Sequence, residues 1–182
     1  MAQNATVHKV HLQLADMDRH HYADYSHTLA QHPSETEERL MMRLLAFMLK
    51  ADEQLEFTRG LCADDEPDLW LKNYSGEIES WIDVGLPSDK RIRKACNRAQ
   101  HVLVLAYGSD QAVTPWWEGI KGQLHRFDNL QVLRVPMEQS QQLADWVQRG
   151  MHLQCTIEDG QLWVTDSERT LMIEPQSLWP QG

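Results

Sequence analysis

The chain has 182 residues, of which 42% are hydrophobic and 24% are charged, and its formal net charge at pH 7 is −10. This length allows one domain that buries about 70% of the surface of its unfolded chain. The composition excludes a mainly disordered protein. The acidic excess also argues against a general nucleic-acid binder, because any such contact would need a local basic patch. We expect a single compact domain spanning residues 1–182.

The cysteines and the N-terminal stretch indicate where the protein works. Cys62, Cys96 and Cys155 are scattered without CxxC spacing, which fits a reducing compartment better than a disulfide framework. Residues 1–16 alternate polar and apolar side chains and therefore do not form the apolar core of a signal peptide. No stretch approaches the ~18 consecutive apolar residues of a membrane span. The sequence predicts a cytoplasmic protein that does not use a membrane.

The first third of the chain predicts a hairpin followed by a helix. Apolar residues alternate with polar ones over residues 10–15, which indicates a half-buried strand, and residues 22–31 are its returning partner. Ser34 and Glu37 have the spacing of a capping box. After them, apolar residues recur at three- and four-residue steps and predict a helix with one broad buried stripe, formed by Leu40, Met41, Leu44, Leu45, Met48 and Leu49.

The rest of the chain alternates predicted strands and helices. Strands are expected at 67–72, 78–84, 101–107 and 130–135, and helices after Ser88 and at 112–123 and 138–148. A final hairpin joins 153–157 to 161–165 through Glu158-Asp159-Gly160. The predicted fold class is α/β, with a mixed sheet flanked by helices and extra hairpins.

The hairpin of residues 67–84 brings two aspartates together. If Ser75-Gly76 is its loop, Lys72 lies opposite Glu79, Trp70 opposite Trp81, and Asp68 opposite Asp83. Opposed residues have Cβ atoms ~4.5–5.5 Å apart, so the two carboxylates can share one Mg²⁺ or Mn²⁺ ion. The alternative is that both aspartates are solvated at the open end of the hairpin.

Glu38 is a third acidic candidate. It precedes Met41, Leu45 and Met48 by three, seven and ten residues, so it extends the apolar stripe into the first helical turn. It can support a metal held by the aspartates. The alternative is simple complementarity with the positive end of the helix dipole, worth about 0.3–1 kcal/mol.

Two motifs resemble known families. Glu66-Pro67-Asp68, followed after fourteen residues by Asp83-Val84-Gly85, resembles the PD-(D/E)xK pattern of restriction-endonuclease-like phosphodiesterases. Residues 32–39, 57–67 and 85–87 look like the YaeQ family of bacterial proteins, and the resemblance runs through nearly the whole chain. It implies a compact variant of the restriction-endonuclease fold. By analogy, Asp68 and Asp83 would be metal ligands and Glu38 a supporting acid.

The sequence departs from the nuclease pattern at one position. The motif lysine is replaced by Gly85, and Lys72 is about 13 Å from Asp68 along the strand. Arg91 and Lys94 are the candidates to replace it, and helical phase places Arg91 nearer the apolar face. The same segment carries five basic residues that can bind phosphates or form an ordinary solvated face: Lys90, Arg91, Arg93, Lys94 and Arg98.

Two functions follow from these residues. The first is a divalent-metal-dependent phosphodiesterase that acts on nucleic acid, with Asp68 and Asp83 as metal ligands, Glu38 in support, and Arg91 or Lys94 in place of the lysine. The alternative is a catalytically inactive protein of the same fold that serves as a regulatory or protein-interaction module. Gly85 and the net charge of −10 favour the alternative.

Overall fold

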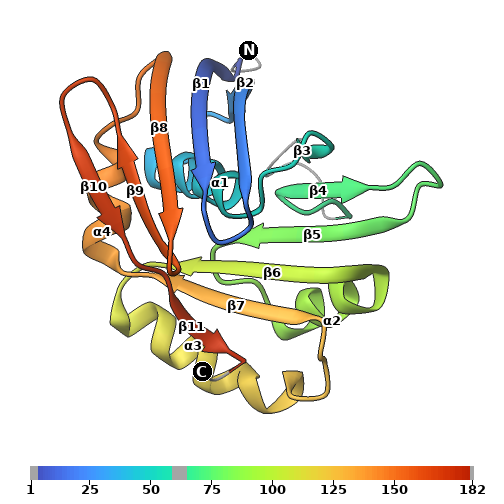
Figure 1. The fold of residues 1–182 in the computed structure, drawn as a ribbon. Coiled ribbons are helices and arrows are strands. Elements are labelled where there is room, and N and C mark those ends of the chain that lie inside the picture. The colour runs from blue at the N-terminus through green and yellow to red at the C-terminus, as the bar shows by residue number, and fades with distance from the viewer. Residues whose placement is uncertain (1–3, 59–64, 181–182) are drawn as a thin grey trace.

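The computed structural model describes residues 4–58 and 65–180, and its strands form two sheets (Figure 1). One sheet has five strands in the order β10-β9-β8-β1-β2, and the other has six in the order β11-β7-β6-β5-β4-β3. The mixed α/β class is confirmed. The first and last hairpins, predicted as additions to one sheet, form the five-stranded sheet together with β10.

The five-stranded sheet joins the two ends of the chain. Strand β1 (Thr6–Asp16) pairs antiparallel with β2 (His21–Gln31) and parallel with β8 (Gly150–Glu158). Strands β9 (Gln161–Thr165) and β10 (Thr170–Ile173) complete it. Val10, Leu12 and Leu14 are buried on one face of β1, as the alternating pattern predicts.

The six-stranded sheet has a parallel centre. Strands β5 (Ile78–Val84), β6 (Ala99–Tyr107) and β7 (Leu130–Val135) run parallel, because the crossover helices α2 (Asp89–Arg98) and α3 (Asp110–Leu124) connect them. The antiparallel strands β3 (Leu55–Phe57), β4 (Leu69–Lys72) and β11 (Gln176–Trp179) lie at its edges. Helices α2 and α3 cover one face, where Trp81, Ile92 and Val104 belong to a common core.

Helix α1 (Glu37–Lys50) lies between the two sheets (Figure 1). Its buried stripe packs in one core with residues of both sheets, and Phe47 and Met48 are fully buried there. The short helix α4 (Met137–Ala144) adds Leu143 to that core. Because α1 contacts both layers, the placement of this helix sets how the two sheets meet. No helix within 4–58 and 65–180 has both the length and the apolar character that a membrane span requires.

Some predicted boundaries are wrong for local reasons. The residue that caps α1 is Thr36, whose side chain accepts a hydrogen bond from the backbone N–H of Arg39, and Ser34 instead contacts His32. Helix α4 ends at Ala144, four residues earlier than predicted. Strands β3, β10 and β11 were not predicted. Each has only three or four residues, too few for a periodic pattern.

The β4–β5 hairpin confirms part of the predicted register. Trp70 pairs with Trp81 as predicted, but a bulge places Lys72 opposite Ile78, so the Lys72–Glu79 pair is wrong. The connection is longer than a two-residue loop, because Asn73 N–H donates to Glu77 O at 2.9 Å. Gly76 has φ +84° in this loop, a conformation that favours glycine.

The capping difference predicts a stability contrast. We expect Thr36→Ala to lower the free energy of unfolding by about 1 kcal/mol, because it leaves a backbone N–H of the first helical turn without its acceptor. Ser34→Ala is the matched control and should change the free energy of unfolding by only a few tenths of the Thr36→Ala loss. Urea unfolding of both variants measures the contrast, and an equal loss in both would contradict the assignment of Thr36 as the cap.

Candidate functional site

The two aspartates meet at one edge of the six-stranded sheet. Asp83 is the penultimate residue of β5, at the carboxyl end of the parallel strands, and Asp68 directly precedes β4. Their exposed fractions are 2% and 4%. Asp68 N–H donates to Ile82 O at 2.9 Å, so the chain continues the strand pairing one step beyond the last paired residues, Leu69 and Ile82. The strand register ends at Leu69 and Ile82, so the predicted Asp68–Asp83 pair is not part of it. Both acids are buried, not solvated.

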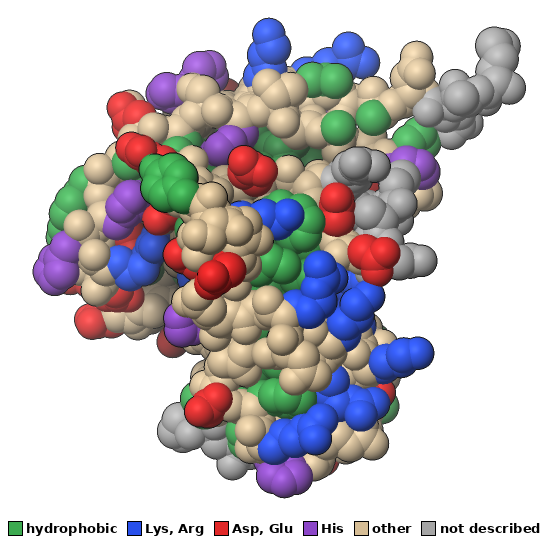
Figure 2. All heavy atoms as spheres, turned by 90° about the vertical axis from the view of Figure 1, so that its right-hand side faces the viewer, with side chains coloured by type: hydrophobic (Ala, Val, Ile, Leu, Met, Phe, Trp, Pro, Cys, Tyr) green, Lys and Arg blue, Asp and Glu red, His purple; other side chains and the backbone are tan. Residues whose placement is uncertain are grey.

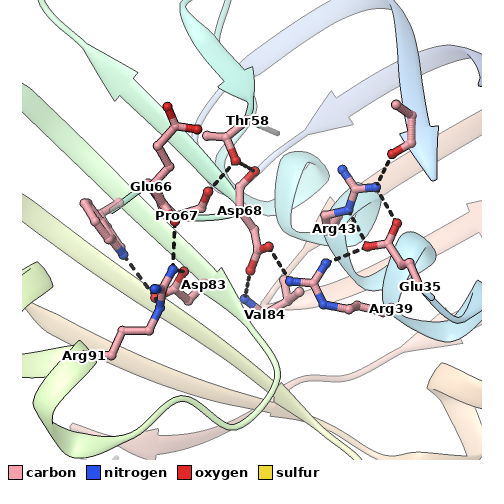
Figure 3. A network of polar contacts seen from close by, with 12 residues as sticks. Glu35, Arg39, Arg43, Thr58, Glu66, Pro67, Asp68, Asp83, Val84 and Arg91 are labelled. Carbon is pink, nitrogen blue, oxygen red and sulfur yellow. Dashed lines mark hydrogen bonds and ion pairs between the residues drawn. The ribbon is translucent and has the colours of Figure 1, made fainter. Parts of the chain in front are cut away.

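Asp68 is held by two donors (Figure 3). Its Oδ1 accepts a hydrogen bond from Arg39 Nη2, and its Oδ2 accepts one from the backbone N–H of Val84 at 2.8 Å. Burial nevertheless raises the pKa of Asp68, because it outweighs the lowering by Arg39 and Val84, and the charge of Asp83 raises it further. The carboxylate is thus costly to bury and is kept in place by its arginine.

Asp83 has a separate arginine (Figure 3). Arg91, in the first turn of α2, donates from Nε to Oδ2 at 3.0 Å and from Nη2 to Oδ1 at 3.1 Å. Trp81 Nε1 donates to Oδ2 at 3.1 Å. Arg91 Nη2 also reaches the carbonyl oxygen of Glu66 at 2.8 Å. This two-point contact fixes both the carboxylate plane and the start of α2.

Glu35, which precedes α1, completes the network. It receives two hydrogen bonds from Arg43, at 3.0 Å from Nε and 2.7 Å from Nη2, and one from Arg39 Nη1 at 2.5 Å. Arg43 also donates to Ala30 O of β2 at 3.0 Å. Arg39 therefore joins Glu35 to Asp68, and its pKa is raised because both acids together outweigh the lowering by burial.

The charges of the network balance. The acids Glu35, Asp68 and Asp83 face three arginines, so the formal charges sum to zero. Buried charges are tolerated when they are paired and hydrogen-bonded in this way.

Glu38 and Lys94 point to other partners. Glu38 is half-buried. Its Oε2 accepts a hydrogen bond from Ser140 Oγ of α4 at 3.5 Å. Burial raises its pKa, and Ser140 lowers it to a smaller extent. Lys94 forms an ion pair at 2.8 Å with Asp65 on the surface. Of the two basic candidates, Arg91 contacts Asp83 and Lys94 contacts Asp65.

The sequence reasoning missed several residues at this edge. Glu35, Arg39 and Arg43 are spaced four residues apart, a spacing that places side chains along one face at a helix start and was an available signal. Tyr107 at the end of β6 had no such signal. Burial raises the pKa of Tyr107 to about 12, and the charges of Arg39, Glu38 and Asp68 also act on it.

The donor chemistry of the pair suits a hard cation, but both carboxylates already have cationic partners. Each of the four carboxylate oxygens of Asp68 and Asp83 accepts an N–H group. Within the described ranges, no three His, Cys, Asp or Glu side chains are grouped so that they could hold a metal ion. A cation that binds the pair would share these oxygens with Arg39 and Arg91 or displace the two guanidinium groups.

A band of basic side chains lies on the face seen in Figure 2, which is the side of Figure 1 where α2 lies. Helix α2 contributes Lys90, Arg91, Arg93, Lys94 and Arg98. Some of this charge is locally compensated, since Arg93 pairs with Asp89 at 3.1 Å and Lys94 with Asp65. The guanidinium of Arg98 lies 5.2 Å from the ring centroid of Trp81. The band places positive charge beside the aspartate pair.

The protein is of the α/β class, with two sheets and an acidic edge whose aspartates pair with arginines. The family model described as "YaeQ protein" matches residues 1–175, and the chain belongs to this family. YaeQ proteins of Escherichia coli (strain K12) and Salmonella typhi are each 45% identical over 181 residues, which cover 100% of this chain and 99% of theirs.

Two crystal structures of YaeQ proteins are similar to this fold. The protein from Xanthomonas axonopodis pv. citri is 46% identical with a TM-score of 0.93, and the match covers 96% of this chain and 98% of that one. The protein from Pseudomonas syringae is 34% identical with a TM-score of 0.92, and 97% of each chain is covered. The family predicted from the motifs is thereby confirmed.

The buried Glu35–Arg43 pair predicts a non-additive double-variant cycle. Glu35→Met should lower the free energy of unfolding by about 3–5 kcal/mol, because it leaves the buried charge of Arg43 without its acid. Arg43→Met should cost less, because Glu35 keeps its ion pair with Arg39. The double variant should lose clearly less than the sum of the two. Denaturant unfolding of all four proteins gives the coupling, and additive losses would show that the pair is not an energetic unit.

The raised pKa of Glu38 predicts a pH-dependent stability difference. Because the folded pKa lies above the ordinary value of 4.5, the stabilising contribution of the protonated form is complete below about pH 4.5 and is lost as the pH rises through the folded pKa. As the pH rises through the folded pKa of Glu38, the Glu38→Gln variant should therefore become more stable relative to the wild type. Unfolding measured between pH 4 and 8 in a chelating buffer tests this, with Glu37→Gln as the exposed control; a pH-independent difference would contradict it.

Proposed function

We propose that the chain is a divalent-metal-dependent phosphodiesterase that acts on nucleic acid, with Asp68 and Asp83 as the metal ligands. One observation carries the proposal. Two buried carboxylates, one near the end of β5 and one directly before β4, lie at the carboxyl end of the parallel strands, which is the edge where open α/β sheets bind their ligands. A Mg²⁺ or Mn²⁺ ion bound there would activate water and offset charge on the phosphoryl oxygens.

The arginines have a defined role in this proposal. A guanidinium binds a phosphate and a carboxylate with the same two-point geometry. Arg39 and Arg91 can therefore exchange their aspartates for phosphate oxygens when a phosphodiester and a cation arrive together. Arg91 takes the place of the motif lysine better than Lys94, because it already contacts Asp83. Glu38, in the first turn of α1, would supply the supporting carboxylate.

The basic side chains of α2 supply the proposed nucleic-acid contact. They lie beside Asp83, to which α2 is joined through Arg91, so a bound backbone would pass over the acid pair. We place the activity in the cytoplasm, a reducing compartment, where the free and buried thiols of Cys96 and Cys155 are expected. Cys62 lies outside the described residues.

A second candidate function is a regulatory or protein-interaction module without catalysis. It is favoured by the complete pairing of the aspartates, which leaves a network of zero net charge that stabilises the fold by itself. Gly85, at the position of the motif lysine, favours it as well. In this reading, the guanidinium groups of Arg39 and Arg91 stay on their aspartates permanently.

A coupled titration separates the two functions. If the arginines exchange partners, Mn²⁺ and a hydrolysis-resistant phosphorothioate oligonucleotide should each raise the affinity for the other, since linkage is reciprocal. We expect the rise in melting temperature with both ligands present to exceed the sum of the rises that each ligand produces alone. Asp68→Asn and Asp83→Asn should abolish this excess, whereas the control Asp89→Asn, in the first turn of α2, should retain it.

The contrary result is equally defined. If Mn²⁺ with the oligonucleotide gives no excess stabilisation in the wild type, or if the excess persists in both aspartate variants, the metal proposal is wrong. The second candidate function then stands. Cleavage of labelled single- and double-stranded DNA and RNA under the same conditions reports the activity itself.

A further inference from the structure

A pocket of about 490 Å³ lies at the other end of the six-stranded sheet, lined by the last residue of α1 and by the amino ends of β6 and β7. We propose that this pocket binds a small organic anion, whose carboxylate or phosphate group contacts Lys50 and whose body lies over residues 80–82 of β5 and 101–103 of β6. The volume falls within the roughly 300–1,000 Å³ of small-molecule sites.

The strand register builds the floor of the pocket. Ser80 is paired with His101 across β5 and β6, and one step along the same face Ile82 is paired with Leu103. Gln131 of β7 is the register partner of Leu103. Because alternate residues of a strand share a face, Ser80 and His101 form one row of the floor, and Ile82, Leu103 and Gln131 form the next. Ile82 and Leu103 are only 1% and 3% exposed, so the accessible side chains of the floor are polar. Such a surface suits a ligand with hydrogen-bonding groups.

Lys50 is the charged group of the lining. It is half-buried, and in the described part of the chain it makes neither a hydrogen bond nor an ion pair. Burial lowers its pKa, the charge of Arg19 lowers it further, and Asp16 opposes both. Asp16 is already bound to Arg19 at 2.7 Å and so is not free to neutralise Lys50. An oxyanion in the pocket would give this cation the partner it lacks.

The other polar groups leave room for a ligand. The side chains of Ser80, His101 and Gln131 form no hydrogen bond with any described residue, although all three line the pocket. Asp128 is the acid of the described lining, and it is exposed and forms no ion pair with Lys50. The pocket thus offers Lys50 and the hydrogen-bonding side chains of Ser80, His101 and Gln131 to an entering anion.

This site is separate from the aspartate pair. Lys50 follows Arg39 by eleven residues on α1, which corresponds to about 16 Å along the helix axis. In β5, Ser80 and Ile82 face the pocket, whereas Asp83 faces α2. The inference therefore does not depend on the proposed phosphodiesterase function.

Binding of simple aryl anions tests the proposal. Phenyl phosphate and benzoate are the probes, and benzamide is the uncharged counterpart. By calorimetry or chemical-shift titration we expect saturable binding of at least one anion to the wild-type protein, and weaker binding of benzamide. Lys50→Met should lower the affinity for the anion by about tenfold or more, because it removes a charge-assisted hydrogen bond. Lys121→Met is the control, since Lys121 lies on α3 and pairs with Glu118 at the surface.

A measurement on the unmutated chain keeps the test independent of variant folding. Lysine acylation followed by mass spectrometry should show that the bound anion protects Lys50 and leaves Lys121 unprotected. The proposal is overturned if neither anion binds or protects at up to about 10 mM, well above a millimolar dissociation constant. It is also overturned if Lys50→Met binds the anions as tightly as the wild type does.

Discussion

The contact on which the rest of the structure depends is the bridge that Arg39 makes between Glu35 and Asp68. It joins the start of α1 to the start of β4, and Arg43 extends the connection from Glu35 to β2. Because buried charges require partners, these contacts fix the helix in one position relative to both sheets. The hydrophobic stripe of α1 explains why the helix is buried, and the ion pairs explain its position relative to the two sheets.

The same bridge governs the chemistry available at the acidic edge. The charge of Asp83 helps to raise the pKa of Asp68, yet each aspartate is held by its own arginine. Under the proposed function, a guanidinium that can bind either a carboxylate or a phosphate would link this closed, charge-balanced state to an open one that accepts a substrate. The opposite end of the sheet differs, because Lys50 has no described partner there. One end is closed by its own side chains, and the other is open to an external anion.

Local pattern predicted much of the fold. The bounds of β5 and β7, the Ser88 cap of α2 and the Trp70–Trp81 pair all follow from neighbouring residues, and each is present in the structure. The position of Arg91 next to Asp83 also follows, because the phase of a helix that begins at a known cap is fixed. The short strands at the sheet edges were not predictable, since their pairing is decided by partners far along the chain.

The sequence by itself determined that Asp68 and Asp83 lie at the open end of one hairpin, because the Trp70–Trp81 register is a local property. Only the tertiary structure decided what they meet. Arg39 is 29 positions from Asp68, and the contact exists because α1 packs against the sheet that carries β4. That packing turned an expected pair of repelling carboxylates into two ion pairs, and it made Glu35, not Glu38, the acid of the network. The reason is physical: charges removed from water are stabilised by the nearest available counter-charge, and only the assembled core sets which one is nearest.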